Sequence, residues 1–136
     1  MLANGATLGY KAGSGSTYTI LRGLKEIPDM GVDPEKVENT TLEDELKQYE
    51  NGIGDAGDMT YKFKFDNTSA DSPYRVMRQM QSDGKTVDFE ETLKDGTKSQ
   101  FSAQVAVKRT GGAVNGVIEF EAAMSLQSNI TFVDPA

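Results

Sequence analysis

The stretch NGIGDAGDMTYKFKFD, residues 51–66, joins a glycine-rich segment to a segment of alternating side chains. In its second half, residues 61–66, aromatic side chains alternate with charged ones. A period of two places the aromatic side chains on one face of an extended strand and the charged side chains on the other. We therefore predict a half-buried β-strand that begins directly after the glycines.

The glycines themselves match a nucleotide-binding pattern. Residues 52–57 read G-x-G-x-x-G, which binds a dinucleotide when a strand precedes it and a helix follows. Here an acidic segment precedes the glycines and a strand follows. Glu50, Asp55 and Asp58 would also repel phosphate. We predict that no nucleotide binds here and that the glycines turn the chain into the strand.

The same alternation recurs along the chain. It predicts strands in residues 86–93, 100–108 and 118–127, with earlier strands at 6–12 and 17–25 and a short one at 129–133. Dipeptides that favour positive φ separate several of these segments: Asp83-Gly84, Asp95-Gly96, Gly111-Gly112 and Asn115-Gly116. The C-terminal half is therefore predicted to be an antiparallel meander.

One helix is predicted at about residues 72–82. Pro73, Val76, Met77 and Met80 recur at helical spacing, and Gly84 follows the end of this segment. Methionines on such a stripe are interpreted as core packing. The expected fold class is mainly β (α+β): an antiparallel β-sandwich or open barrel, with one flanking α-helix and a long inter-strand arm. Residues 1–136 are expected to form a single domain.

Composition excludes several classes of function. Cysteine and histidine are absent, which removes thiolate chemistry, the commonest general base and the commonest transition-metal ligand. The N-terminus does not read as a signal peptide, and no apolar run approaches the ~20 residues that span a bilayer. We expect an intracellular, soluble protein that is not an enzyme and has no cofactor, no metal and no membrane contact.

The net charge of −7 is unevenly distributed. Residues 26–58 contain eleven acids and two bases, whereas the remainder contains ten acids and twelve bases. Direct nucleic-acid binding by one copy is not expected, because phosphate affinity needs clustered Lys and Arg. The acidic segment is either a solvated loop or a segment that meets something complementary, such as the mildly basic remainder of a second copy.

Residues 28–56 carry no sustained period, and so long a segment in a compact domain is usually an interaction arm, functional, or disordered. We interpret them as an arm that orders against a neighbouring molecule, because apolar residues are scattered along them. The predicted contact residues are Met30, Val32, Val37, Leu42, Leu46, Tyr49 and Ile53.

Several groups of carboxylates could be interpreted as catalytic or metal-binding residues. Residues 43–45 and 88–91 each group acids that could in principle supply an acid–base pair or a Ca²⁺ site, but no segment follows the calcium-loop pattern. Four acids fall on the polar faces of predicted strands, where solvation is the default: Asp88, Glu90, Glu119 and Glu121. No catalytic site is predicted.

Residues 17–67 taken together resemble the major tail (tail tube) proteins of long-tailed bacteriophages and prophages. The pattern is a strand ending in L-x-x-I-P-x, a long polar arm containing V-E-N-T-T-L, a glycine-rich turn and then a strand similar to G-D-x-x-F-x-x-x-F/W. The residues that carry this resemblance are Leu24, Ile27, Pro28, Val37, Glu38, Thr40, Thr41, Leu42, Gly57, Asp58 and Phe65. A short helix and three strands follow, which is the order of elements in that family.

The resemblance implies a structural virion protein that assembles as stacked, hexameric rings into a hollow tail tube. By the same resemblance its partners would be further copies of itself, a tape measure protein, a tail terminator and distal tail or baseplate proteins. DNA would cross the lumen without specific binding, and the protein would be made in the bacterial host cytoplasm and reside in the virion. Acids facing the lumen would repel DNA; the candidates are Asp88, Glu90, Glu119 and Glu121.

Two alternatives remain open at this point. One is a free-standing, non-catalytic β-sandwich that binds a sugar or a protein. The other is the tube protein of a related phage-like injection or secretion machine, which would share the fold. A binding module should remain monomeric, whereas a tube subunit should form rings or polymers.

Overall fold

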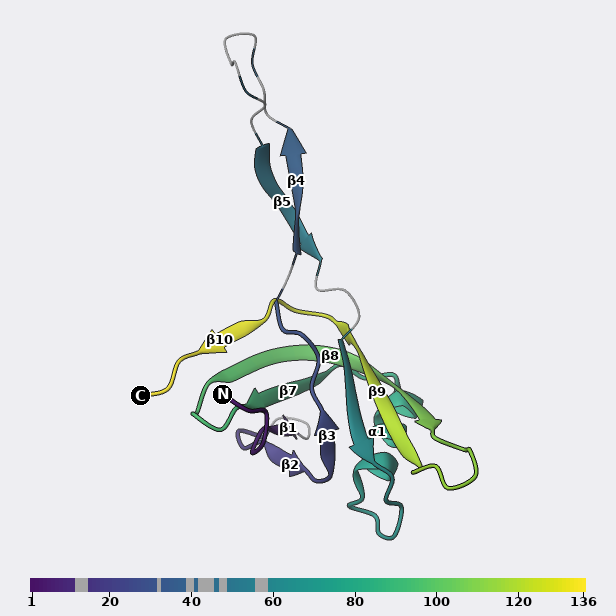
Figure 1. The fold of residues 1–136 in the computed structure, drawn as a ribbon. Helices are drawn as coiled ribbons and strands as arrows, with labels where there is room; N and C mark the ends of the chain where they lie inside the picture. The colour runs from purple at the N-terminus through teal and green to yellow at the C-terminus, as the bar shows by residue number, and fades with distance from the viewer. Residues whose placement is uncertain (12–14, 32, 39–40, 42–45, 47–48, 56–58) are drawn as a thin grey trace.

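The computed structural model describes residues 1–11, 15–31, 33–38, 41, 46, 49–55 and 59–136. These described residues form an eight-stranded antiparallel sheet, one helix and a separate two-stranded hairpin (Figure 1). The strands of the large sheet are β1 (Thr7–Lys11), β2 (Thr19–Leu21), β3 (Leu24–Glu26), β6 (Met59–Lys64), β7 (Val87–Thr92), β8 (Lys98–Thr110), β9 (Glu119–Leu126) and β10 (Thr131–Val133). The predicted mainly β class is confirmed.

The large sheet is curled and open. Its strands run in the order β2-β1-β7-β8-β9-β6-β3, and β10 pairs with the first residues of β8, beyond the reach of β9. The edge strands β2 and β3 are consecutive in the chain, yet in the described part of the chain they do not pair with each other. Of the two predicted architectures, the structure therefore has the open-barrel form.

The turn between β2 and β3 was not predicted, because residues 17–25 were expected to form one strand. Gly23 has a φ of +86°, a conformation that glycine adopts without strain and that ends the extended run. The Gly23 carbonyl accepts a 2.7 Å hydrogen bond from the Lys64 backbone N–H at the end of β6. This turn takes the chain from one edge of the curled sheet to the other.

Aromatic side chains fill the inner face of the sheet, as the alternation predicts. Tyr61 and Phe63 of β6 are fully buried. The ring of Phe63 stacks on Phe120 of β9 with centroids 5.2 Å apart, and Phe89 of β7 stacks on Phe101 of β8 at 5.7 Å. Stacked rings contribute beyond their buried area, so these pairs hold adjacent strands around one core.

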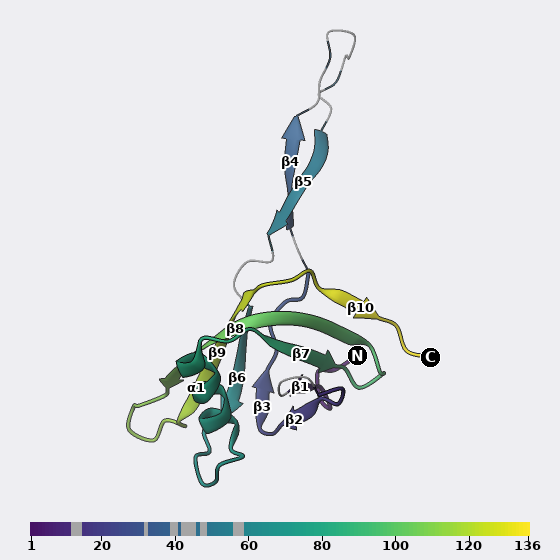
Figure 2. The ribbon, with the colours of Figure 1, turned by 180° about the vertical axis from the view of Figure 1, so that it is seen from behind.

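The helix α1 (Pro73–Asp83) packs against β8. Figure 2, the view from behind, shows α1 in front of the large sheet. Met77 is fully buried, which confirms the predicted core role of the apolar stripe. Arg75 fixes the start of the helix by donating hydrogen bonds to the side chain and carbonyl of Asn67, at 2.9 and 3.1 Å. Gly84 ends the helix with a φ of +62°.

Candidate assembly surfaces

The arm of the predicted fold is a β-hairpin. Among the described residues, its strands β4 (Asp33–Glu38) and β5 (Tyr49–Asp55) pair with each other and with no further strand, and the hairpin projects away from the large sheet in both views (Figures 1 and 2). Sequence periodicity did not reveal these strands. An isolated two-stranded hairpin is marginally stable in water, so contact with another molecule would increase the stability of this element.

The prediction that the glycines of residues 52–57 form a turn is wrong for two of them. Gly52 and Gly54 lie within β5. Pro34 pairs with Gly54 and Lys36 with Asn51, so one residue of β4 faces two residues of β5. Such a bulge is a usual place for glycine in a strand. Gly57 lies outside the described residues.

The predicted contact residues of the arm fall into three groups. Met30 packs against the core at the base of the arm, and Leu46 is 77% exposed. For Val37, Tyr49 and Ile53 the structure places the backbone in β4 and β5. Val32 and Leu42 lie outside the described residues. The contact role of all seven remains a prediction.

The four acids singled out in the sequence lie on one face of the large sheet, opposite the aromatic core. Cross-strand register places Asp88 beside Ser102, and Glu90 beside Gln100. Glu121 lies beside both Lys62 and Lys108. Except for Lys108, these residues alternate with buried neighbours along their strands. The period of two alone placed these acids on the polar face.

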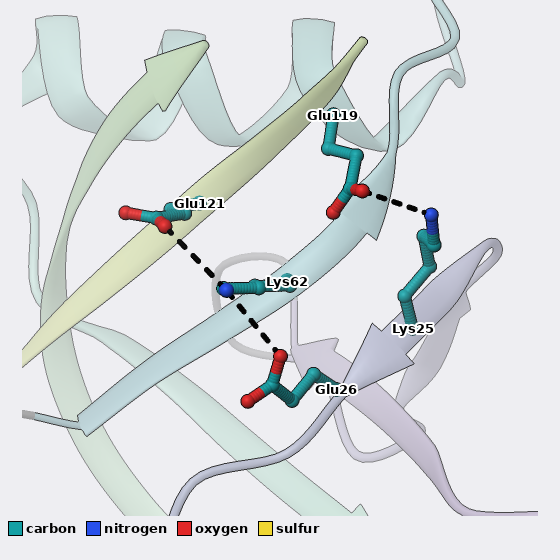
Figure 3. Close-up of polar contacts among 5 residues, drawn as sticks. All are labelled: Lys25, Glu26, Lys62, Glu119 and Glu121. Carbon is teal, nitrogen blue, oxygen red and sulfur yellow. Dashed lines mark hydrogen bonds and ion pairs between the residues drawn. The ribbon is translucent and has the colours of Figure 1, made fainter. Parts of the chain in front are cut away.

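Lysines that sequence reasoning did not connect with these acids lie beside them (Figure 3). Lys25 Nζ is 3.0 Å from a carboxylate oxygen of Glu119. Lys62 Nζ lies between Glu26 and Glu121, at 3.4 and 4.0 Å. We call these ion pairs the ladder. Each pair is partly exposed and contributes about 0–1 kcal/mol to stability. The main effect of the ladder is therefore to neutralise charge on this face.

The other two acids also have partners. The Glu90 carboxylate accepts a 2.7 Å hydrogen bond from Gln100 Nε2 and lies 3.8 Å from Lys98 Nζ. Asp88 accepts a hydrogen bond from the Ser102 hydroxyl. The polar face is therefore charge-compensated, because Lys residues from β3, β6 and β8 lie beside its Glu residues.

One acid is placed on the opposite face. Glu91 is 3% exposed and points into the core with Tyr61. Burial raises the pKa of Glu91, and the nearby Tyr61 hydroxyl only partly opposes this. Burial, and secondarily the charge of Glu91, raises the pKa of Tyr61. Among the described residues, neither Tyr61 Oη nor Glu91 Oε1 has a hydrogen-bond partner.

The acidic group at residues 88–91 is thus divided between the two faces of the sheet. In the part of the chain that the structure describes, no three acidic side chains gather in a way that could hold a metal ion. Within the same residues, no helix is long and apolar enough to cross a membrane. What the described surface offers is a charge-balanced sheet face and a projecting hairpin.

An open sheet, one flanking helix and a self-paired projecting arm define a structural subunit suited to contacts with further molecules. Residues 1–132 match the family model described as phage tail tube, TTP, lambda-like. The chain belongs to this family and is a structural tail tube protein of phage-like particles. No curated protein matches it.

Solved structures of phage-like particles share the fold. A chain in the tail of an empty gene transfer agent particle, refined with C6 symmetry, is 23% identical, with 94% of this chain and 96% of that one covered and a TM-score of 0.71. A chain of the native gene transfer agent virion is 18% identical, with 98% and 99% covered and a TM-score of 0.73. A chain from the six-fold symmetrised baseplate of the anti-feeding prophage is 9% identical, with 98% and 95% covered and a TM-score of 0.70.

Proposed function

We propose that this chain assembles as rings of six copies that stack head to tail into the hollow tube of a phage tail. The observation that carries this proposal is the hairpin β4–β5, whose strands pair with no other strand that the structure describes and which stands away from the large sheet. A hairpin of this kind is stabilised when a neighbouring molecule covers it. The sixfold symmetry reported for particles with a similar fold supports the ring number.

Identical copies in such an assembly meet through different surfaces. Head-to-tail contacts form a closed ring when the rotation between successive copies adds up to a full turn. When it does not, they form an open-ended stack or filament. The acidic segment 26–58 and the mildly basic remainder of the chain give such contacts complementary charge. The whole chain, residues 1–136, acts as one domain in this proposal, and the arm contacts an adjacent subunit or ring through the seven predicted apolar residues.

The polar face of the sheet lines the lumen in this proposal. Asp88, Glu90, Glu119 and Glu121 would then face the passing DNA together with their Lys partners. A charge-compensated lining offers DNA neither a cluster of unpaired cations to bind nor a strongly repulsive surface. DNA would therefore move through the tube without specific binding.

The further partners are those of a tail tube: a tape measure protein inside the lumen, a terminator at one end and distal tail or baseplate proteins at the other. The subunit would be made in the bacterial host cytoplasm and function in the virion, without catalysis. A tube of a related injection machine is the second candidate. The similar chain in the anti-feeding prophage baseplate favours including it.

Light scattering and negative-stain microscopy of the purified chain across a concentration series test the proposal. We expect rings or tubes with sixfold end views at high concentration. A chain that remains monomeric at every concentration and salt, including after addition of preformed tail ends, would refute the proposal and favour a monomeric binding module. Recovery of tubes from DNA-filled particles would separate a phage tail from an injection machine.

A further inference from the structure

The loop between β8 and β9 exposes large apolar side chains. Val114 is 94% exposed, Val117 62% and Ile118 46%. We call these three residues the hairpin tip, where the hairpin is the one formed by β8 and β9 and not the arm hairpin β4–β5. Single exposed apolar residues are normal on a protein surface, but a cluster within five consecutive residues marks a candidate contact surface.

The backbone of this loop has a defined shape. Gly111 has a φ of +84°, and a Cβ at this position would lie 2.0 Å from the Val117 carbonyl oxygen. Asn115 also has a positive φ, of +62°, and the Gly116 N–H donates a 2.9 Å hydrogen bond to the Ala113 carbonyl. Gly111, Asn115 and Gly116 thus form a tight turn that keeps the apolar side chains of the hairpin tip exposed to water. Such preorganisation reduces the entropy lost when a surface binds.

The hairpin tip lies at the end of the sheet opposite the arm. Glu119, which follows the tip, pairs with Lys64 at the last position of β6. The arm strand β5 ends at Asp55, four residues before Met59, the first residue of β6. At about 3.3 Å per residue, β6 separates the two ends by roughly 17 Å. The arm and the tip accordingly lie at opposite ends of the body (Figure 1).

Charge also distinguishes the two ends. Lys108 and Arg109 are exposed on β8 directly before the tip, whereas the acids nearest to them, Glu119 and Glu121, already have Lys25 and Lys62 as ion-pair partners. The arm strands β4 and β5 carry five acids and one base. Leu46, between these strands, is exposed. The arm therefore combines negative charge with an exposed apolar side chain, which complements a basic, apolar tip.

We propose that the hairpin tip is the surface that receives the arm of the next copy in the stack. This inference rests on the proposed function and adds the identity of the receiving surface. Because the arm and the tip lie at opposite ends, one copy cannot satisfy both surfaces itself. A second copy in the same orientation brings its arm to the tip, and the contact repeats along the tube.

Serine substitution tests the apolar part of this contact. We compare Val114→Ser/Val117→Ser with the wild type and with Val114→Ile/Val117→Ile, which keeps the tip apolar. Loss of two buried valine contacts should raise the concentration needed for assembly about tenfold or more, whereas the isoleucine variant should assemble near the wild-type concentration. Thermal melting should remain within a few degrees for both, because the positions are exposed.

Cross-linking identifies the occupant directly, since the chain has no cysteine of its own. Single-cysteine proteins Val114→Cys and Leu46→Cys are mixed, assembled and treated with a bismaleimide. We expect a cross-linked dimer that contains one copy of each. The control pair, Val114→Cys with Ser82→Cys on the exposed surface of α1, should give much less product.

The outcomes separate the two proposals. A wild-type chain that never assembles overturns the proposed function and this inference together. Normal tubes from the serine variant, or equal cross-linking to positions 46 and 82, overturn this inference alone. Binding of the wild-type tip, but not the serine variant, to phosphatidylcholine vesicles while tubes are unaffected would assign the tip to a membrane and would also overturn it.

Discussion

The Glu91 carboxylate and the Tyr61 hydroxyl lie close together in the core, yet among the described residues Tyr61 Oη and Glu91 Oε1 have no hydrogen-bond partner. Both groups are buried on the inner face of the sheet, among aromatic rings. Burying a polar group without a partner costs about 1–3 kcal/mol. This pair is therefore a local weakness of the core and a source of pH dependence.

Glu91→Gln should flatten the pH dependence of stability. The folded-state pKa of Glu91 lies above its ordinary value, so below that ordinary value the carboxyl is protonated in both states. As the pH rises from there towards the folded-state pKa, only the unfolded chain releases the proton, and the wild-type free energy of unfolding falls before it levels off. The variant should be more stable than the wild type at pH 8, and this advantage should shrink towards pH 4.

Urea unfolding followed by circular dichroism from pH 4 to pH 8 measures this difference. Glu90→Gln is the matched control, since Glu90 lies one residue away on the polar face with Lys98 and Gln100 as partners. An offset between Glu91→Gln and wild type that is the same at every pH would contradict the assignment of a raised pKa.

The stack of Phe63 on Phe120 should carry much of the stability of the β6–β9 pair. Both rings are fully buried, and their planes are within 8° of parallel. Phe63→Ala should lower the free energy of unfolding by about 3–5 kcal/mol, because it removes the ring and leaves a cavity. Phe132→Ala is the control: Phe132 is 57% exposed, and its loss should change the unfolding free energy by less than ~1 kcal/mol. Urea midpoints that shift equally would contradict this account.

Two glycines with positive φ should respond differently to alanine. At Gly84 a Cβ meets nothing within 4 Å, so Gly84→Ala costs only the strain of the left-handed conformation, about 1–2 kcal/mol. At Gly111 the Cβ would clash with backbone atoms of Val117 as well. We expect Gly111→Ala to reduce the melting temperature more than Gly84→Ala does. Similar melting temperatures for the two variants would show that the loop yields easily.

Lys62 should matter more for charge than for folding. Lys62→Met removes the cation between Glu26 and Glu121, and the partly exposed pairs contribute only about 0–1 kcal/mol each. The melting temperature should change by a few degrees at most, and this change should diminish in 1 M salt. A large loss of stability that persists in high salt would mean that the ladder has a packing role.

Replacement of residues 33–55 by a short Gly-Ser linker should leave the body folded. In the described part of the chain the hairpin β4–β5 has no strand partner in the body, whereas Met30 at the base of the arm packs against the core and is retained. We expect a circular dichroism spectrum and a cooperative melting transition close to those of the full chain, with no tubes in the microscope. Normal tubes from this variant would contradict the role assigned to the arm.

Local patterns in the sequence determined much of this fold. The alternation in residues 61–66 and 118–127 predicted which side chains enter the core, and the spacing of Pro73, Val76, Met77 and Met80 predicted the helix. These patterns work because a strand or helix repeats its faces with a fixed period that is independent of its partners. The positive φ of Gly84, Gly96, Gly111 and Asn115 follows from the same local chemistry.

Tertiary structure alone decided which strands pair and what lies beside each charge. Periodicity assigns a side chain to a face, but pairing between residues distant in the chain depends on how all the strands share one core. For this reason Lys25 could not be matched to Glu119, and Glu91 was grouped with Asp88 and Glu90 although it points into the core. The hairpin β4–β5 escaped prediction because its residues carry no sustained apolar period. The sequence thus determined the faces of this tail tube protein, and the packing of its strands decided the partners.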